Sequence, residues 1–202
     1  MDDAVGDTLR LKVIVVGEPS SGKTSTIHNF IDTKIGVEFS SKFITINGKE
    51  CELRLWDIAG QDHYSGMSRV YYSGSLGALI MCDVTKMNTV EGSLKWKHSI
   101  DDCIFVNNEK IPVLLVGNKS DLLDAAAMDT MATKLKDVAA NNGFKGMLLV
   151  SAKTGYNLDE TMNNIATLII SQFGDMLYKE KAESDENTLD LLPKQQNEKK
   201  CC

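Results

Sequence analysis

Apolar residues along the chain fall in blocks of strand and helix length that are separated by turns. Residues 9–16 form an apolar, β-branched run that ends at Gly17, which predicts a strand buried on both faces. Further apolar runs predict strands at residues 76–83, 111–117 and 145–151. Stretches of helix length lie between or after them, at residues 22–30, 89–106, 124–142 and 157–173. This alternation predicts a mostly parallel sheet covered by helices.

One pair of predicted strands differs from the others because a tight turn joins it. Residues 38–46 and 50–57 flank Asn47-Gly48, which is a strong signal for an antiparallel hairpin. We therefore predict an α/β fold with a six-stranded, mostly parallel sheet, one antiparallel edge strand and helices on both faces. In such sheets ligands bind beyond the carboxyl ends of the strands.

The composition is that of a soluble globular protein. The chain has 202 residues, of which 43% are hydrophobic and 25% are charged, and its formal net charge is −6. This balance disfavours a basic nucleic-acid binder. No uncharged apolar run approaches the roughly 18 residues that span a bilayer, and the N-terminus does not look like a signal peptide. We expect the body of the protein to lie in the cytosol, without a nucleic-acid partner and without an obligate oligomer.

The regular pattern stops near Gly174. From there the chain is polar, mixed in charge and almost without aromatic residues, which predicts disorder. We therefore predict one folded domain over residues 1–173 and a disordered tail over residues 174–202.

The five cysteines divide into two groups. Cys51, Cys82 and Cys103 have neither metal-ligand nor disulfide spacing, and we expect them to be small core residues. Cys201 and Cys202 are adjacent at the end of the polar tail, which could not bury them.

The first motif with candidate chemistry follows the first strand directly. Residues 17–24 read GEPSSGKT, a full GxxxxGK[ST] between a predicted strand and a predicted helix. In such a P-loop the backbone N–H groups point at phosphates, Lys23 supplies a positive charge and the Thr24 hydroxyl can coordinate Mg²⁺. This context disfavours a glycine-rich turn without function. The candidate nucleotide-binding residues of this P-loop NTPase motif are Gly17, Ser20, Ser21, Gly22, Lys23, Thr24 and Ser25.

A second motif, LWDIAGQ, occupies residues 55–61 at the end of a predicted strand. Asp57 can hold Mg²⁺ through water, Gly60 can offer its N–H to a γ-phosphate, and Gln61 can orient an attacking water as the catalytic residue. This motif is weak evidence alone, but it is strong evidence when it follows a P-loop.

Two further motifs concern the base. Residues 118–121, NKSD, contain Asn118, Lys119 and Asp121, and the Asp121 carboxylate suits a base with two adjacent N–H donors, as guanine has. A second polar turn with Ser151, Ala152 and Lys153 would place a backbone N–H near the guanine carbonyl and a lysine stem over the ring. Either turn alone could be ordinary; four motifs in this order predict guanine nucleotide binding.

With these motifs, residues 9–173 resemble the Ras superfamily of small GTPases. The Tyr71-Tyr72 pair, the sequence IGVEF at residues 35–39 and the terminal double cysteine resemble the Rab family of vesicle-traffic regulators. WDIAGQ in place of WDTAGQ, with LKWK at residues 94–97, is similar to the Rab branch linked to lysosome-related organelles and mitochondria. The resemblance implies bound GTP or GDP with Mg²⁺, and slow hydrolysis without a GTPase-activating protein.

The chain departs from this family in switch I. Ile35 follows Lys23 by twelve residues, about eight fewer than family members place before the switch I sequence that γ-phosphate and Mg²⁺ order. Lys34 stands in place of the metal-binding threonine, and Thr33 is one residue away. Phe30 aligns with a helix position and not with the aromatic residue that packs on guanine.

Geometry limits how this shortening can be absorbed. A helix over residues 24–32 would carry the chain roughly 12 Å from the phosphates, and one or two extended residues would return only about 3 to 7 Å. Three explanations stay open: the helix ends early, Thr33 misses the metal, or the sequence is an imperfect gene model or splice form.

The terminal cysteines imply a membrane anchor. In the Rab family such cysteines are both geranylgeranylated with the help of an escort protein, and two lipid chains anchor stably where one binds marginally. The resemblance therefore implies lipidation of Cys201 and Cys202 and residence on the cytosolic face of intracellular membranes, with an endosome or lysosome-related organelle favoured. It also implies a cytosolic pool bound to a GDP-dissociation inhibitor.

Two functional hypotheses stand from the sequence. The first is a GTP-hydrolysing switch in vesicle and membrane trafficking, with an exchange factor, a GTPase-activating protein and effectors as partners. The second, favoured by the shortened switch I, is a membrane-tethered pseudo-GTPase adaptor with impaired switching. An ATP-using P-loop kinase is disfavoured by NKSD and by the lack of a lid insertion.

Overall fold

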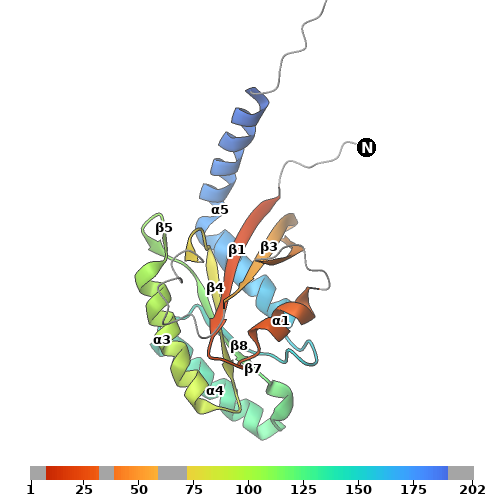
Figure 1. The fold of residues 1–202 in the computed structure, drawn as a ribbon, viewed down its shortest axis with the longest axis vertical. Coiled ribbons are helices and arrows are strands. Elements are labelled where there is room, and N and C mark those ends of the chain that lie inside the picture. The colour runs from red at the N-terminus through yellow and green to blue at the C-terminus, as the bar shows by residue number, and fades with distance from the viewer. Residues whose placement is uncertain (1–7, 32–38, 59–71, 191–202) are drawn as a thin grey trace, which may run out of the picture.

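The computed structural model describes residues 8–31, 39–58 and 72–190, with side chains up to residue 183. Within them, six strands form one sheet in the order β2-β3-β1-β4-β7-β8 (Figure 1). The strands of this sheet are β1 (Leu9–Gly17), β2 (Ser40–Ile46), β3 (Lys49–Asp57), β4 (Gly77–Asp83), β7 (Val113–Asn118) and β8 (Gly146–Leu149). The helices are α1 (Lys23–Phe30), α3 (Met87–Cys103), the 3₁₀ helix η2 (Ser120–Leu122), α4 (Ala125–Asn141) and α5 (Leu158–Asp190).

The strand pairing confirms the predicted fold class. β2 pairs antiparallel with β3, and the turn between them has positive φ at both Asn47 and Gly48, which suits a tight hairpin. The other neighbours, β3 with β1, β1 with β4, β4 with β7 and β7 with β8, are parallel. The sheet is therefore mostly parallel, with β2 as its antiparallel edge strand.

Helices cover both faces of the sheet. A Cβ at Gly77 of β4 would lie 2.8 Å from Ile169 of α5, whereas one at Gly117 of β7 would lie 2.6 Å from Leu135 of α4. Gly117 stands opposite Cys82 in the ladder of β4 and β7, so the two residues face the same side of the sheet. Cys82 is an odd number of residues from Gly77, and side chains at such a spacing point to opposite faces of a strand. The contacts of α5 at Gly77 and of α4 at Gly117 therefore lie on opposite faces.

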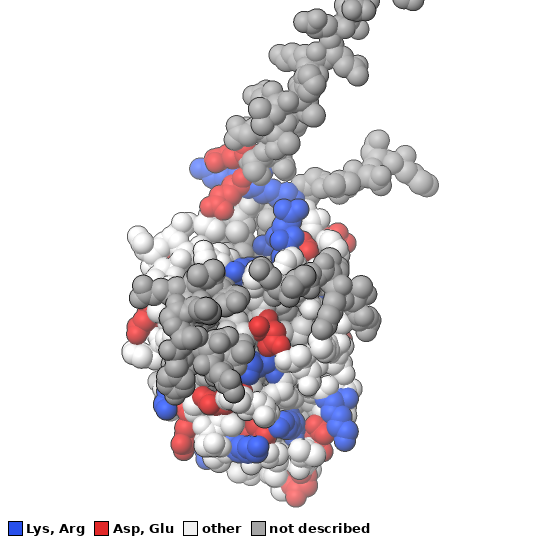
Figure 2. Space-filling model, viewed as in Figure 1, with Lys and Arg blue, Asp and Glu red and all other residues white. Residues whose placement is uncertain are grey.

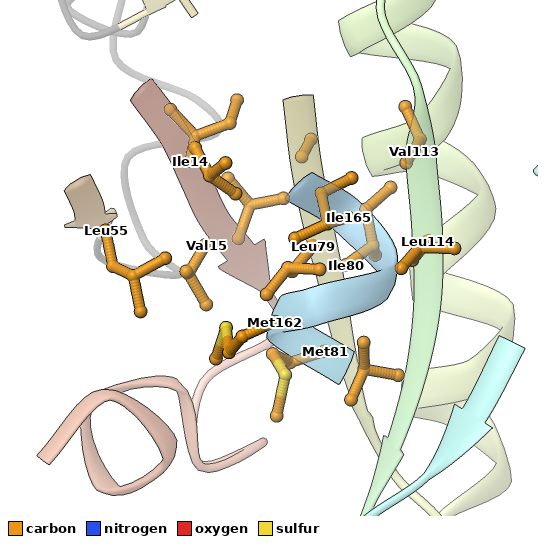
Figure 3. Close-up of a cluster of buried hydrophobic side chains, with 14 of the residues drawn as sticks. Ile14, Val15, Leu55, Leu79, Ile80, Met81, Val113, Leu114, Met162 and Ile165 are labelled. Carbon is orange, nitrogen blue, oxygen red and sulfur yellow. The ribbon is translucent and has the colours of Figure 1, made fainter. Parts of the chain in front are cut away.

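The core on the α5 face consists of close-packed aliphatic and methionine side chains. Met162 and Ile165 of α5 lie beside Leu79 and Met81 of β4, and all four are fully buried (Figure 3). This packing holds the central strands rigidly, so the loops at their carboxyl ends start from fixed positions.

The last helix is longer than the sequence pattern predicts. α5 continues to Asp190, so the expectation of disorder from Gly174 is wrong for residues 174–190; residues 191–202 lie outside the described part of the chain. Tertiary contacts stabilise the first part of this extension: the Lys49 Nζ lies 3.9 Å from the centre of the Tyr178 ring, and the Asn107 amide donates to the Met176 Sδ at 2.8 Å. In Figure 1 the end of α5 extends away from the body of the domain.

A short hairpin precedes β7. The sequence pattern predicts helix to residue 106, but α3 ends at Cys103, and β5 (Phe105–Val106) pairs antiparallel with β6 (Glu109–Lys110). The turn residues Asn107 and Asn108 have φ of 50° and 65°, which suits asparagine in a two-residue hairpin turn.

The cysteines of the folded part differ in environment. Cys51 and Cys82 are buried, as predicted, and burial raises the pKa of both thiols, that of Cys82 to about 12. Cys103 is exposed, so its prediction as a core residue is wrong. It is the last residue of α3, and with Asp102 it lies on the exposed side of the helix, whereas Ile100 and Ile104 are buried.

Candidate functional site

The candidate site begins at the loop between β1 and α1. Gly17 has φ of +139°, and a Cβ there would lie 2.1 Å from the carbonyl oxygen of Met81 on β4. Gly22, the N-cap of α1, has φ of +95°, and a Cβ there would lie 2.1 Å from the Asn118 amide nitrogen. Both positions therefore require glycine, because a side chain would collide with neighbouring strands or loops.

Lys23 is held at the start of α1. Its Nζ donates to the carbonyl oxygens of Gly17 and Glu18, each at 3.0 Å, and the residue is only 6% exposed. Burial lowers the pKa of Lys23, and the nearby carboxylates of Asp57 and Glu18 oppose this effect. The ammonium group is thus fixed beside the N-terminus of a helix, where an anion is favoured.

Thr24 and Asp57 bring two oxygen atoms together at the solvent-exposed side of this loop. The Thr24 hydroxyl donates a hydrogen bond to the Asp57 Oδ2 atom. A hydroxyl and a carboxylate from two different elements are the hard oxygen ligands that Mg²⁺ takes, usually together with waters. The donor set therefore fits a magnesium ion.

Asn118 joins the phosphate loop to the two base-loop motifs. Its Nδ2 donates to the Ser21 carbonyl oxygen at 2.9 Å, and its Oδ1 accepts from the Ala152 N–H at 2.9 Å. Ser151 adds a second link, because its hydroxyl donates to the Asp121 Oδ1 at 2.6 Å. Three segments far apart in the sequence thus form one connected site.

A pocket of about 350 Å³ opens between these segments. It is lined by Gly22, Ser25, Asn118, Lys119, Asp121, Leu122, Ala152 and Lys153. Asp121 offers the pocket a carboxylate, which only accepts hydrogen bonds, and the lysine stems offer apolar walls. This combination suits a flat ring that carries adjacent N–H donors.

The structure brings most of the predicted site residues together. The P-loop residues, Asp57, Asn118, Lys119, Asp121, Ser151, Ala152 and Lys153 all lie in the described part of the chain. Gly60, Gln61, Thr33, Cys201 and Cys202 lie outside the described residues. The sequence analysis missed Leu122, which lines the pocket, and Asp83, which pairs with Lys119 at 2.6 Å. A charged residue that closes the apolar run of residues 76–83 is a signal that could have pointed to Asp83.

The fold and this site define a P-loop GTPase of the Ras type. A sequence profile of the Ras family matches residues 12–171. Ras-related protein Rab-32A of Dictyostelium discoideum is 39% identical over 170 residues, which cover 79% of this chain and 77% of its own length. Ras-related protein Rab-32 of Sus scrofa is 31% identical over 204 residues, which cover 95% of this chain and 88% of its own. The chain therefore belongs to the Ras family and is a Rab GTPase that resembles the Rab-32 branch.

Proposed function

We propose that the protein is a GTP-binding and GTP-hydrolysing switch that regulates intracellular vesicle and membrane trafficking. The observation that carries this proposal is the Asn118 side chain, which hydrogen-bonds the phosphate loop on one side and the base loop on the other. A bridge of this kind makes phosphate binding and base recognition a single event. Membership of the Ras family and similarity to Rab proteins support the same function.

Different described residues would bind the phosphates, the guanine base and the magnesium ion. Lys23 and the N-terminus of α1 would hold the phosphates, while Asp121 and the lysine stems would select and cover guanine. Thr24 and Asp57 would hold Mg²⁺, which neutralises phosphate charge when bound. Gln61, outside the described residues, would orient the attacking water.

Replacing Gln61 by Leu should slow single-turnover GTP hydrolysis by roughly 10²-fold, because a misplaced water loses its near-attack geometry. The intrinsic rate itself should be slow, on the order of 10⁻⁴ to 10⁻² per second, since neither of the described arginines, Arg10 and Arg54, lines the nucleotide pocket as a built-in finger would. Gln172→Leu on α5 is the matched control, because that amide donates to Glu109 and Lys110, away from the nucleotide site. An equal rate in the Gln61 variant would remove this residue from the mechanism.

Membrane attachment through Cys201 and Cys202 is part of the proposal. Among the described residues no helix has the length and apolarity of a membrane span. In the view of Figure 2, acidic and basic side chains are interspersed over the described surface, so that face offers no broad basic patch for anionic lipids. Two geranylgeranyl groups, attached through an escort protein, would supply stable anchoring. The partners we propose are an exchange factor, a GTPase-activating protein, a GDP-dissociation inhibitor and effectors.

The double variant Cys201→Ser, Cys202→Ser should move the protein from the membrane fraction to the soluble fraction of expressing cells, because a chain without its lipids has lost the anchor. Cys103→Ser is the control, since that thiol is exposed but lies on α3, away from the terminal double cysteine in sequence. Persistent membrane association of the double variant would point to a protein tether instead.

One observation favours the second candidate function, a membrane-tethered pseudo-GTPase adaptor. α1 ends at Phe30, which is 4% exposed, and the Lys42 ammonium lies 4.2 Å from the centre of its ring. Phe30 is thus committed to the core and cannot pack on a base. An adaptor of this kind would be purified without bound nucleotide, which separates the two candidates.

A further inference from the structure

We infer that Asp83 is a positioning residue that acts through Lys119 and slows the release of the nucleotide. The inference rests on the proposed function and concerns the same pocket. Asp83 belongs to none of the four motifs and does not line the pocket itself. It closes β4, directly behind the base loop.

Hydrogen bonds fix the Asp83 carboxylate at both oxygen atoms. Its Oδ2 accepts from the Lys119 Nζ at 2.6 Å. Its Oδ1 accepts from the backbone N–H of Thr85 at 3.0 Å and from the Thr85 hydroxyl at 2.6 Å. With both oxygens engaged, the carboxylate cannot turn, so it presents a fixed anchor to the lysine.

Asp83 is also deeply buried, with a side chain 2% exposed. Burial alone would raise the pKa of Asp83, but the hydrogen bonds from Lys119 and Thr85 outweigh it and hold the pKa below its ordinary value. The carboxylate is therefore charged at neutral pH. A buried charge of this kind depends strongly on its partner, because removal of either partner leaves the other uncompensated.

Lys119 connects this anchor to the pocket. Its backbone has φ of +70°, which is unusual for a residue with a side chain, and its stem lines the pocket. Asp83 holds the head of the side chain, so the stem is fixed at both of its ends. A tethered stem loses less rotamer entropy when a ring packs on it.

The backbone near Asp83 does not need the ion pair to keep its place. Asp83 stands opposite Asn118 in the parallel ladder of β4 and β7, and the N–H of Val84 donates to the Asn118 carbonyl oxygen at 3.0 Å. These bonds join backbone atoms only, so we expect them to persist when the side chain is changed. The specific effect of Asp83 therefore falls on the side chain of Lys119.

The test compares dissociation of a fluorescent guanosine diphosphate from the wild-type protein and from Asp83→Asn. The substitution keeps the shape and one acceptor for Thr85 but turns an amide donor toward the ammonium group. We expect dissociation to be roughly two- to tenfold faster, the range for the ordering cost of one long side chain on binding. The control is Asp101→Asn on α3, which breaks a similar pair with Lys97 at 2.6 Å that lies outside the pocket lining. The control should leave the dissociation rate unchanged.

A double-mutant cycle separates positioning from general destabilisation. Lys119→Met keeps the stem and removes the ammonium group, so adding Asp83→Asn to it should produce no further increase in the dissociation rate. An added increase would show that Asp83 acts through the fold, and an unchanged rate in the single Asp83 variant would equally overturn the inference. Either result leaves the proposed function standing when the wild-type protein binds guanosine diphosphate; failure of the wild-type protein to bind it would overturn both.

Discussion

Replacing Asp121 by Asn should lower the affinity for GTP by roughly 10³- to 10⁴-fold and shift the preference toward xanthosine triphosphate. The Asp121 carboxylate lines the pocket and accepts one hydrogen bond from Ser151, so it has acceptor capacity left for a base. A site built to pair with two donors discriminates strongly, because a mismatched base leaves buried polar groups unpaired. Competition binding with GTP and xanthosine triphosphate measures both halves of this expectation.

The matched control is Asp124→Asn, which makes the same change of charge three residues further along. Asp124 caps α4 by accepting from the Ala127 N–H at 2.8 Å, and Asn caps a helix about as well. Asp124 does not line the pocket. GTP affinity should therefore be unchanged in this variant. Equal GTP affinity in the Asp121 variant would contradict the assignment of the base-reading carboxylate.

Replacing Gly17 by Ala should cost about 2 to 6 kcal/mol of the free energy of unfolding and abolish nucleotide binding. The added Cβ would lie 2.1 Å from the Met81 carbonyl oxygen, which is backbone of a central strand and cannot move aside. We expect about 1 to 3 kcal/mol from this overpacking and about 1 to 3 kcal/mol from the φ of +139°. The melting temperature should fall by roughly 5 to 20 °C in a calorimetric or fluorescence scan.

The variant Gly48→Ala separates the cost of overpacking from the cost of backbone strain. Gly48 also has positive φ, +78°, but a Cβ there would meet nothing within 4 Å. Only the backbone strain remains, so this variant should lose about 1 kcal/mol, or roughly 2 to 4 °C. A Gly17 variant as stable as the Gly48 variant would show that β1 and β4 can separate at this point, which would contradict the rigid placement of the phosphate loop.

The sheet could be predicted because its signals are local. The apolar run of residues 9–16 needs only its own residues to indicate a buried strand, and Asn47-Gly48 fixes its hairpin by backbone preference alone. The antiparallel pairing of residues 38–46 with residues 50–57 follows from that turn, and the structure confirms it.

The features that sequence reasoning missed depend on contacts between distant residues. The extension of α5 is stabilised by the contact of the Lys49 ammonium group with the Tyr178 ring and by the hydrogen bond from Asn107 to Met176. No local sequence pattern predicts either contact. The β5–β6 hairpin was missed for a different reason: strands of two residues are too short to show periodicity.

In the candidate site too, local motifs predicted some residues, whereas others depend on contacts between distant parts of the chain. Motif spacing placed Lys23, Asn118 and Asp121 at strand ends, and the structure brings these ends together. Asp83 was not predicted, because it acts through a hydrogen bond with Lys119, which is 36 residues away. No rule of motif spacing links these two residues. The roles of Gly60 and Gln61 stay predictions, since these residues lie outside the described part of the chain.

The central claim is that this pocket holds a guanine nucleotide with Mg²⁺, and the nucleotide content of the purified full-length protein tests it most directly. The protein should be denatured, and the released nucleotide identified and quantified by chromatography, before and after incubation with a chelator. We predict an equimolar amount of GDP or GTP that is lost on chelation, because Thr24 and Asp57 would hold the ion against the phosphates. Protein without nucleotide, or with an adenine nucleotide, would contradict the account.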